Sequence, residues 1–269
     1  MARVSAGTQG PCWMAGVTDI FSDQLAAWRS YVDSPWGRIR YRVVRETLRR
    51  EAARLGSGLR ILDVGGGDGM DAVPLAQDGH HVTILDQSAR WLTQARSRAA
   101  AAGAHLDTVL GDLDDPPALG AFDMVLCHFV LQYRPPASDD VRHLAAFTRS
   151  GGTVSVMLPN PATMVLRQLI LHSPAAALRE LGASTAHAMT FDHDVRKISA
   201  DTMEATLRDN GLPVVRRYAA RIANDLIAAN DPKYDPTYFE ALLDLELALC
   251  DQEPFVRIGG MYQLISTKH

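Results

Sequence analysis

The sequence predicts an α/β protein built on a doubly wound, mostly parallel sheet of seven strands. Short apolar segments of strand length alternate with helical segments along most of the 269 residues, a pattern typical of a parallel sheet covered on both faces. A glycine-rich turn follows the first strand, where such sheets bind ligands. The composition, 47% apolar and 22% charged residues, is that of an ordinary globular protein. We therefore expect one large core with additional helical segments around it.

Seven segments have the length, composition and bounding turns of β-strands. Between them lie helical segments, such as the one that Ser88 is expected to cap and that stops at Gly103. Another helix is expected to start at a capping box at Asp201 and to end at Gly211. The regular alternation breaks twice, and we interpret the two irregular stretches as lid insertions, one after the fifth strand and one before the last. The first holds an apolar segment at residues 164–171 followed by loop-like sequence, and the second an amphipathic stretch at residues 238–249. The predicted strands comprise residues 61–64, 82–86, 106–110, 122–127, 152–158, 214–219 and 261–267.

The predicted organisation has three parts. Residues 1–17 are expected to form a disordered leader, residues 18–58 an N-terminal helical cap, and residues 59–269 the main domain. The lid insertions fall at about residues 160–198 and 224–254.

One arginine of the helical cap stands out by its position. Val44, Leu48, Ala52 and Leu55 recur at helical spacing as an apolar stripe, and Arg40 lies one turn before Val44 on this stripe. An arginine on a buried face requires an anionic partner. The alternative is that its aliphatic stem covers the apolar surface while the guanidinium reaches water. A separate basic face is predicted from Arg38, Arg42, Arg45 and Arg49.

The turn after the first strand has the chemistry of a cofactor-binding loop. Asp63 lies inside the strand, and Gly65, Gly67 and Gly69 follow it. Glycine permits positive φ values and close approach of a ligand to the backbone, and the amides of the next helix face that ligand. Residues 67–72 also satisfy the dinucleotide pattern G-x-G-x-x-A, a weak match by itself. The acidic-G-x-G-x-G arrangement instead resembles the turn of class I S-adenosylmethionine (SAM) methyltransferases.

Further polar residues follow the carboxyl ends of the other strands, where ligands of open α/β sheets bind. Asp86 ends the second strand, at a position from which a carboxylate can accept both ribose hydroxyls. Asp112 follows Gly111 and can accept from an adenine amino group while Leu113 packs on the ring, although an Asx turn before Pro116 is an equal alternative. His128 ends the fourth strand as a cofactor contact, a general base or a core histidine.

Longer stretches of the chain resemble a narrower family. Residues 36–40 (WGRIR), residues 127–131 (CHFVL) and the tail at residues 238–246 and 250–255 (YFEALLDLE and CDQEPF) are similar to bacterial enzymes that methylate the carboxylate of carboxymethoxyuridine at the tRNA wobble position. The similarity runs from about Ile20 to the end of the chain. It implies a Rossmann-like fold, SAM as cofactor and methyl transfer as the activity.

The resemblance also implies roles for single residues. It places Arg40 on the SAM carboxylate, and Gly65 and Gly66 under the methionine moiety. Asp86 is expected on the ribose, and Arg221 lies where that family carries an arginine that could face the acceptor's carboxylate. The alternative for Arg221 is a pair with Asp225, one helical turn later. His128 and Arg221 are our candidate catalytic residues. The full expected cofactor site comprises Arg40, Asp63, Gly65, Gly66, Gly67, Asp86, Gln87, Gly111, Asp112, Leu113 and His128.

The acceptor is less constrained than the cofactor. The tRNA enzymes carry a lysine-rich stretch after the fifth strand, whereas residues 182–199 offer only Arg196 and Lys197 against two aspartates, and residues 221–269 hold four Lys or Arg against eight Asp or Glu. Phosphate contacts supply most of the affinity for nucleic acid. We therefore expect a small-metabolite acceptor, methylated on oxygen, with a carboxylate as one candidate for the methylated group. The alternatives are the tRNA itself, supported by nine arginines between Arg29 and Arg60, and a nucleotide-binding module without catalysis.

Other features set wider bounds on the protein. Cys12, Cys127 and Cys250 are odd in number and lack metal-ligand spacing, so neither a disulfide framework nor a metal site is expected. No signal sequence or apolar run of membrane-spanning length is present, which predicts a cytoplasmic protein with no membrane partner. A monomer and a homodimer both fit the sequence. Four tyrosines either line the acceptor pocket or belong to the core, namely Tyr218, Tyr234, Tyr238 and Tyr262.

Overall fold

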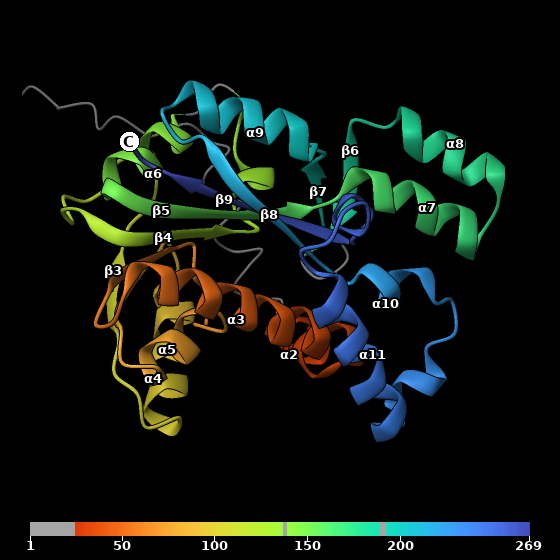
Figure 1. Ribbon diagram of the computed structural model, residues 1–269, viewed down its shortest axis with the longest axis horizontal. Coiled ribbons are helices and arrows are strands. Elements are labelled where there is room, and N and C mark those ends of the chain that lie inside the picture. Colours follow the sequence, from red (N-terminus) through yellow and green to blue (C-terminus); the bar gives the residue numbers. More distant parts are fainter. Residues whose placement is uncertain (1–24, 137–138, 189–191) are drawn as a thin grey trace, which may run out of the picture.

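The computed structural model of the chain describes residues 25–136, 139–188 and 192–269. Its centre is a seven-stranded sheet with the order β3-β2-β1-β4-β5-β9-β8 (Figure 1). β9 runs antiparallel to its neighbours β5 and β8, and the other pairs are parallel. The strands are β1 (Arg60–Val64), β2 (His81–Asp86), β3 (Asp107–Leu110), β4 (Phe122–His128), β5 (Thr148–Pro159), β8 (Val214–Ala220) and β9 (Met261–Thr267).

The predicted fold class is thus confirmed, with all seven strands at the predicted places. The predicted leader, residues 1–17, lies outside the described residues, as does the beginning of the helical cap.

Alternate residues of the strands face two separate cores, one on each side of the sheet. In β1, Ile61 packs on one side and Leu62 on the other, as the two-residue period of a strand requires. The first core lies under α3 (Pro35–Leu55), α4 (Ala72–Gln77) and α5 (Ala89–Ala101), and the second under α6 (Asp140–Phe147) and α9 (Ala200–Asp209). Figure 1 shows these two helical layers below and above the sheet.

The long helix α3 carries the predicted apolar stripe into the first core. Val44 and Leu48 are fully buried, and Ser34 caps the helix by accepting from the amide of Gly37. A side chain at Gly37 would place its Cβ 2.0 Å from the Tyr31 carbonyl oxygen. This glycine therefore lets α2 (Leu25–Asp33) run directly into α3.

The two insertions form structure that the sequence pattern only partly predicted. The first contains α7 (Pro161–Leu171), α8 (Pro174–Gly182) and a hairpin of β6 (Thr185–Ala188) and β7 (His193–Arg196); it extends beyond the sheet in Figure 1. α8 and the hairpin were expected as loop. The second insertion contains the short helix α10 (Ile222–Leu226), the 3₁₀ turn η2 (Asp231–Tyr234), the predicted amphipathic helix α11 (Pro236–Leu249) and the turn η3 (Phe255–Arg257). A further 3₁₀ turn, η1 (Leu131–Tyr133), follows β4.

The four tyrosines divide between core and surface. Tyr218 and Tyr262 are buried, with Tyr218 donating to Glu51, whereas Tyr234 and Tyr238 are exposed. None of them lines the cavity described below. In the described part of the chain, no helix combines the length and the apolar character that a bilayer span requires.

Candidate active site

The carboxyl ends of the strands open into a cavity of about 610 Å³. It is bounded by the glycine turn, by the ends of β2 and β4, by aromatic side chains from α2 and α3, and by the two insertions. All of the predicted cofactor and acceptor residues line it. The sequence analysis did not predict that Asp68, Asp71 or Arg167 would join them, nor the aromatic group of Trp28, Tyr31, Trp36, Tyr41 and Trp91.

The glycine turn forms one wall of the cavity. Gly65, Gly67 and Gly69 have φ values of 67°, 54° and 79°, in the left-handed region that the sequence predicted. Gly65 and Gly66 also permit close packing. A Cβ on Gly65 would lie 2.4 Å from Val130 Cγ2, and one on Gly66 would lie 2.5 Å from the Asp63 carboxylate. Side chains at these positions would therefore disrupt the wall.

Asp86 joins the glycine turn to the end of β2. Its Oδ2 accepts from the Gly67 amide at 3.0 Å and its Oδ1 from the Ser88 amide at 2.8 Å. Burial nevertheless raises the pKa of Asp86 above the ordinary value of an aspartate. Gln87 lies beside it on the cavity wall. The carboxylate is thus fixed by two backbone amides while it faces the cavity.

The wall after β3 contains the Asx turn that was an alternative for Asp112. Its Oδ1 accepts from the amides of Asp114 and Asp115 at 2.7 and 3.2 Å. Gly111 donates its amide to the Asp86 carbonyl oxygen, and Leu113 is buried against the second core. Asp112 therefore has a structural role whether or not it also contacts a ligand.

Arg40 has the anionic partner that its position required. Its Nη2 donates to Asp71 Oδ2 at 3.1 Å, and its guanidinium lies over the rings of Tyr41 and Phe129. Only 4% of the residue is exposed, so the alternative, in which the guanidinium reaches water, is wrong. Burial alone would raise the pKa of Asp71, but Arg40 and His128 hold it below its ordinary value. Asp71, directly after the glycine turn, was missed because no pattern of the sequence distinguishes it from a helix-capping aspartate.

His128 belongs to a chain of buried hydrogen bonds across the sheet. Its Nδ1 lies 2.9 Å from Asp71 Oδ2 and its Nε2 lies 2.9 Å from Ser155 Oγ. The chain continues from Gln263 Nε2 to Ser155 Oγ at 2.9 Å and from Thr47 Oγ1 to Gln263 Oε1 at 2.7 Å. Because an ionised carboxylate only accepts, Nδ1 carries the proton and Nε2 accepts from Ser155.

This geometry argues against a general base at His128. Both ring nitrogens already have protein partners, so neither has a lone pair directed at a proton of an acceptor. We therefore assign His128 to the packing of the cavity wall and the orientation of Asp71. Its contact with the cofactor stays a prediction.

One side of the cavity is acidic. Four aspartates gather where the glycine turn meets β2 and α4, opposed by Arg40 and by Arg98, whose Nη2 lies 2.6 Å from Asp68 Oδ2. Burial raises the pKa of Asp63 well above its ordinary value, and the neighbouring aspartates raise it further. This part of the cavity therefore favours a ligand that brings positive charge. The four aspartates are Asp63, Asp68, Asp71 and Asp86.

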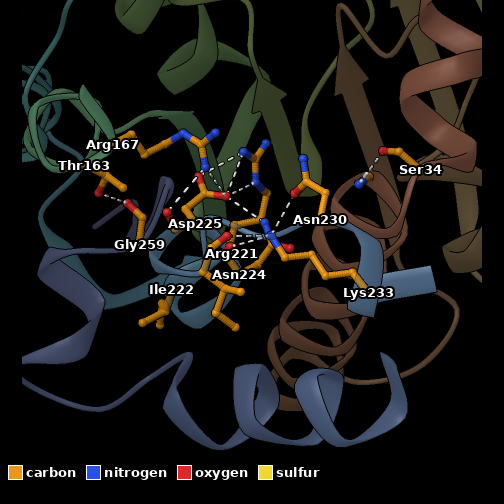
Figure 2. A network of polar contacts seen from close by, with 12 residues as sticks. Ser34, Thr163, Arg167, Arg221, Ile222, Asn224, Asp225, Asn230, Lys233 and Gly259 are labelled. Carbon is orange, nitrogen blue, oxygen red and sulfur yellow. Dashed lines mark hydrogen bonds and ion pairs between the residues drawn. The ribbon is translucent and has the colours of Figure 1, made fainter. Parts of the chain in front are cut away.

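At the opposite side, Arg221 pairs with Asp225 (Figure 2). Arg221 Nε and Nη2 donate to the two carboxylate oxygens at 2.8 and 2.9 Å. Arg221 has a left-handed backbone with φ of 60°. Burial would lower the pKa of Arg221, but Asp225 and Tyr31 raise it. The structure thus contains both the predicted position of Arg221 at the cavity and the alternative, its pairing with Asp225.

Two buried charges hold the loop beneath this pair. Glu246 of α11 accepts from the amides of Ile222 and Asn224, both at 2.8 Å. The ammonium of Lys233 donates to the carbonyl oxygens of Asn224 and Ile227 and to a side-chain oxygen. Lys233 is 2% exposed, and burial lowers its pKa. Both groups stabilise the fold rather than face the cavity.

Comparison with known proteins agrees with this architecture. A family model described as a methyltransferase domain matches residues 61–152. The chain is 26% identical over 242 residues, covering 86% of this chain and 89% of the relative, to the tRNA 5-carboxymethoxyuridine methyltransferase of Escherichia coli. It is 34% identical over 99 residues, covering 36% of this chain and 42% of the relative, to the ubiquinone biosynthesis O-methyltransferase of Vibrio parahaemolyticus.

The chain carries a methyltransferase domain. A solved structure of magnesium protoporphyrin IX methyltransferase from Synechocystis, with bound S-adenosylhomocysteine, superposes with a TM-score of 0.62 at 19% identity, over 94% of this chain and 98% of that one. The protein is a SAM-dependent methyltransferase of class I fold, as the glycine turn predicted. The dinucleotide alternative is thereby set aside.

Proposed function

We propose that this methyltransferase transfers the methyl group of SAM to an oxygen of a small anionic acceptor, and that this oxygen belongs to a carboxylate. The observation that carries the proposal is the separation of charge along the cavity. Four aspartates lie around the glycine turn, and the two cavity arginines of the insertions, Arg167 and Arg221, share one aspartate at the other side.

The acidic side suits the cofactor. When bound, SAM supplies an electrophilic methyl group on a positively charged sulfonium. We propose that Gly65 and Gly66 hold its methionine part and that Asp86, fixed by two amides, binds the ribose. Arg40 is suited to the cofactor carboxylate, because its buried Nε has no hydrogen-bond partner within the described part of the chain.

The basic side suits the acceptor. A guanidinium binds carboxylates through two parallel hydrogen bonds, and two guanidiniums with one aspartate leave an excess of positive charge. A carboxylate is already ionised near neutral pH, so its methylation needs no general base. A reaction without a general base fits this cavity. Both nitrogens of His128 are bound to protein groups, and burial raises the pKa of Tyr133 to about 12.

A tRNA acceptor is the second candidate, favoured by the match to the tRNA enzyme along most of both chains. That enzyme's name specifies a carboxymethoxyuridine, which contains a carboxyl group as the first candidate's acceptor does. The acidic character of residues 221–269, four Lys or Arg against eight Asp or Glu, disfavours contact with a phosphate backbone there. We therefore place the small acceptor first.

One paired experiment separates the two candidates. Bulk tRNA and extracted metabolites from a deletion strain are compared with those of the parent strain by mass spectrometry. We expect an anionic metabolite to accumulate unmethylated while the tRNA is unchanged. Loss of a methyl ester from tRNA would favour the second candidate. A methylated amine as the missing product would contradict the proposal of oxygen transfer.

A further inference from the structure

The lid helix α7 brings a second arginine to the acceptor side of the cavity. Its base is fixed to the segment before β9: Asn160 Nδ2 donates to the Gly259 carbonyl oxygen at 3.0 Å, and Thr163 Oγ1 to the same oxygen at 2.6 Å. Arg167 follows Thr163 by one helical turn and therefore lies on the same face of α7. Figure 2 shows Thr163 at Gly259 and Arg167 directed toward Asp225. The hydrogen bonds at the start of α7 therefore fix the position at which Arg167 enters the cavity lining.

The two arginines hold Asp225 very differently. Arg221 uses two nitrogens at 2.8 and 2.9 Å, whereas Arg167 approaches with Nη1 alone, at 3.4 Å from both Oδ1 and the carbonyl oxygen of Asp225. Distances of 3.4 Å lie beyond the usual range for a charged hydrogen bond. Within the described part of the chain, Arg167 Nε and Nη2 make no hydrogen bond. Its side chain is 36% exposed, against 15% for Arg221.

Asp225 has little remaining capacity for Arg167. Its Oδ1 also accepts from Asn224 Nδ2 at 2.7 Å, and the carboxylate is 2% exposed. One negative charge is therefore already matched by Arg221, and the charge of Arg167 remains largely uncompensated. An incoming anion can bind Arg167 without breaking a strong contact, whereas binding the engaged edge of Arg221 would separate a buried ion pair.

We propose that Arg167 is the acceptor-binding arginine of this enzyme, and that the Arg221–Asp225 pair is the rigid surface against which the acceptor rests. The site takes a carboxylate, or an oxyanion of similar shape, on the free edge of the Arg167 guanidinium. Its role in catalysis rests on the proposed function, because it supposes an anionic acceptor. The anion site itself does not depend on which anion is methylated.

Inorganic phosphate is a suitable probe, because it presents oxygens to a guanidinium as a carboxylate does. The full-length protein, labelled with ¹⁵N-arginine and saturated with S-adenosylhomocysteine, is titrated with phosphate at constant ionic strength. The Nε–Hε signals are assigned with Arg167→Lys and Arg221→Lys. We expect the Arg167 signal to move saturably and the Arg221 signal to stay in place. Movement of the Arg221 signal alone, or of neither, would overturn the assignment.

Matched variants test whether the charge or its position matters. Arg167→Leu should weaken phosphate binding at least about tenfold, as expected for loss of a charged hydrogen-bond donor, while Arg167→Lys retains part of it. Arg179→Leu removes an exposed charge from the neighbouring lid helix and should leave the affinity unchanged. Equal losses in Arg167→Leu and Arg179→Leu would indicate only a general field effect and refute the site. Affinity for S-adenosylhomocysteine reports whether each variant is folded, and Arg167→Gln replaces any leucine variant that is not.

The two proposals can fail separately. If the metabolite comparison yields an acceptor without an anionic group, the proposed function is wrong even when phosphate binds at Arg167. If it yields an anionic acceptor whose KM is the same in wild type and Arg167→Gln, the proposed function stands and the assignment of Arg167 is wrong.

Discussion

At the scale of single residues, the acidic side of the cavity is defined by side chains whose charges depend on their surroundings. Asp86 is held by two amides, Asp71 by a buried arginine and a histidine, and Asp63 lies between other carboxylates. Each of these environments produces a separate expectation.

Asp86→Ala should weaken SAM binding by about 2 kcal/mol or more, because two hydrogen bonds to a charged acceptor would be lost. Calorimetric titration measures the affinity, and the melting temperature without cofactor reports the separate cost of losing the contacts to the Gly67 and Ser88 amides. Unchanged SAM affinity in a folded variant would remove Asp86 from the cofactor site.

Arg40→Met preserves the apolar stripe but leaves Asp71 buried beside His128 without its cation. We expect a loss of about 3 kcal/mol in the free energy of unfolding, the usual cost of breaking a buried pair on one side. Adding Asp71→Asn should recover most of this loss. If the double variant is stable and binds SAM as wild type does, Arg40 has a structural role only.

Asp63→Asn should change how stability depends on pH. Because burial raises the pKa of Asp63 in the folded protein, its contribution to stability is fully present below the unfolded value of about 3.9 and is lost as the pH rises through the folded pKa. The asparagine variant lacks this loss. Urea unfolding without SAM should therefore show that the stability of the variant rises relative to that of wild type as the pH increases from about 4 through the raised pKa of Asp63, by about 1.4 kcal/mol for each unit by which the pKa is raised. A constant difference would contradict the raised pKa.

At the scale of elements, three adjacent strands and one helix are joined by the hydrogen-bond chain from His128 to Thr47. β4, β5, β9 and α3 each contribute one buried polar side chain to it. Buried polar chains are stabilising only when every member is satisfied.

Ser155→Ala should therefore lower the free energy of unfolding by about 1–3 kcal/mol, since His128 Nε2 and the Gln263 amide both lose their partner. Ser266→Ala is the matched control: Ser266 is equally buried in β9, and its Oγ has no hydrogen-bond partner in the described chain. Removal of this hydroxyl should change the free energy of unfolding only slightly. Similar losses in the two variants, measured by urea unfolding, would show that the chain adds nothing beyond ordinary packing.

Apolar periodicity in the sequence predicted some helices and strands and missed others. The strands and the helices α3, α5 and α11 were predicted because their apolar positions repeat at the period of the element. α9 was predicted too, but its cap is Ser199 rather than Asp201. α8 and the β6–β7 hairpin were missed: only Ala177 of α8 is buried, and the hairpin strands are four residues long. Elements that bury so little leave no apolar pattern to detect.

At the scale of the whole molecule, the cavity lies between the sheet and the two insertions, with opposite charge at its two sides. This arrangement makes a prediction about the reaction as a whole. With a carboxylate acceptor, the rate of methyl transfer should be nearly flat above about pH 6, because the acceptor is already ionised.

Initial rates with the identified acceptor, measured in wild type and in His128→Ala, test this expectation. A rate that rises with pH, together with a loss of about 100-fold or more in His128→Ala, would indicate a proton-removing base. The acceptor would then be an amine or a hydroxyl, and His128 would have to exchange one of its present partners during turnover.

The fold class and most of the residues that line the cavity around the glycine turn could be predicted from the sequence, because they depend on local features: periodicity, glycines that permit positive φ, and carboxylates at strand ends. The cofactor followed from the resemblance of this turn to that of class I methyltransferases. It also identified Arg40 as an arginine in need of a partner. Arg167, within the apolar segment of residues 164–171, offered the same clue, but it was not used. The Arg221–Asp225 pair spans a single helical turn, and the sequence already offered it as an alternative. The tertiary structure was needed to join Asp71 to Arg40 and His128, and Asp225 to Arg167. These partners come from separate elements, and whether a charge stays available to a ligand depends on distances that no local pattern encodes.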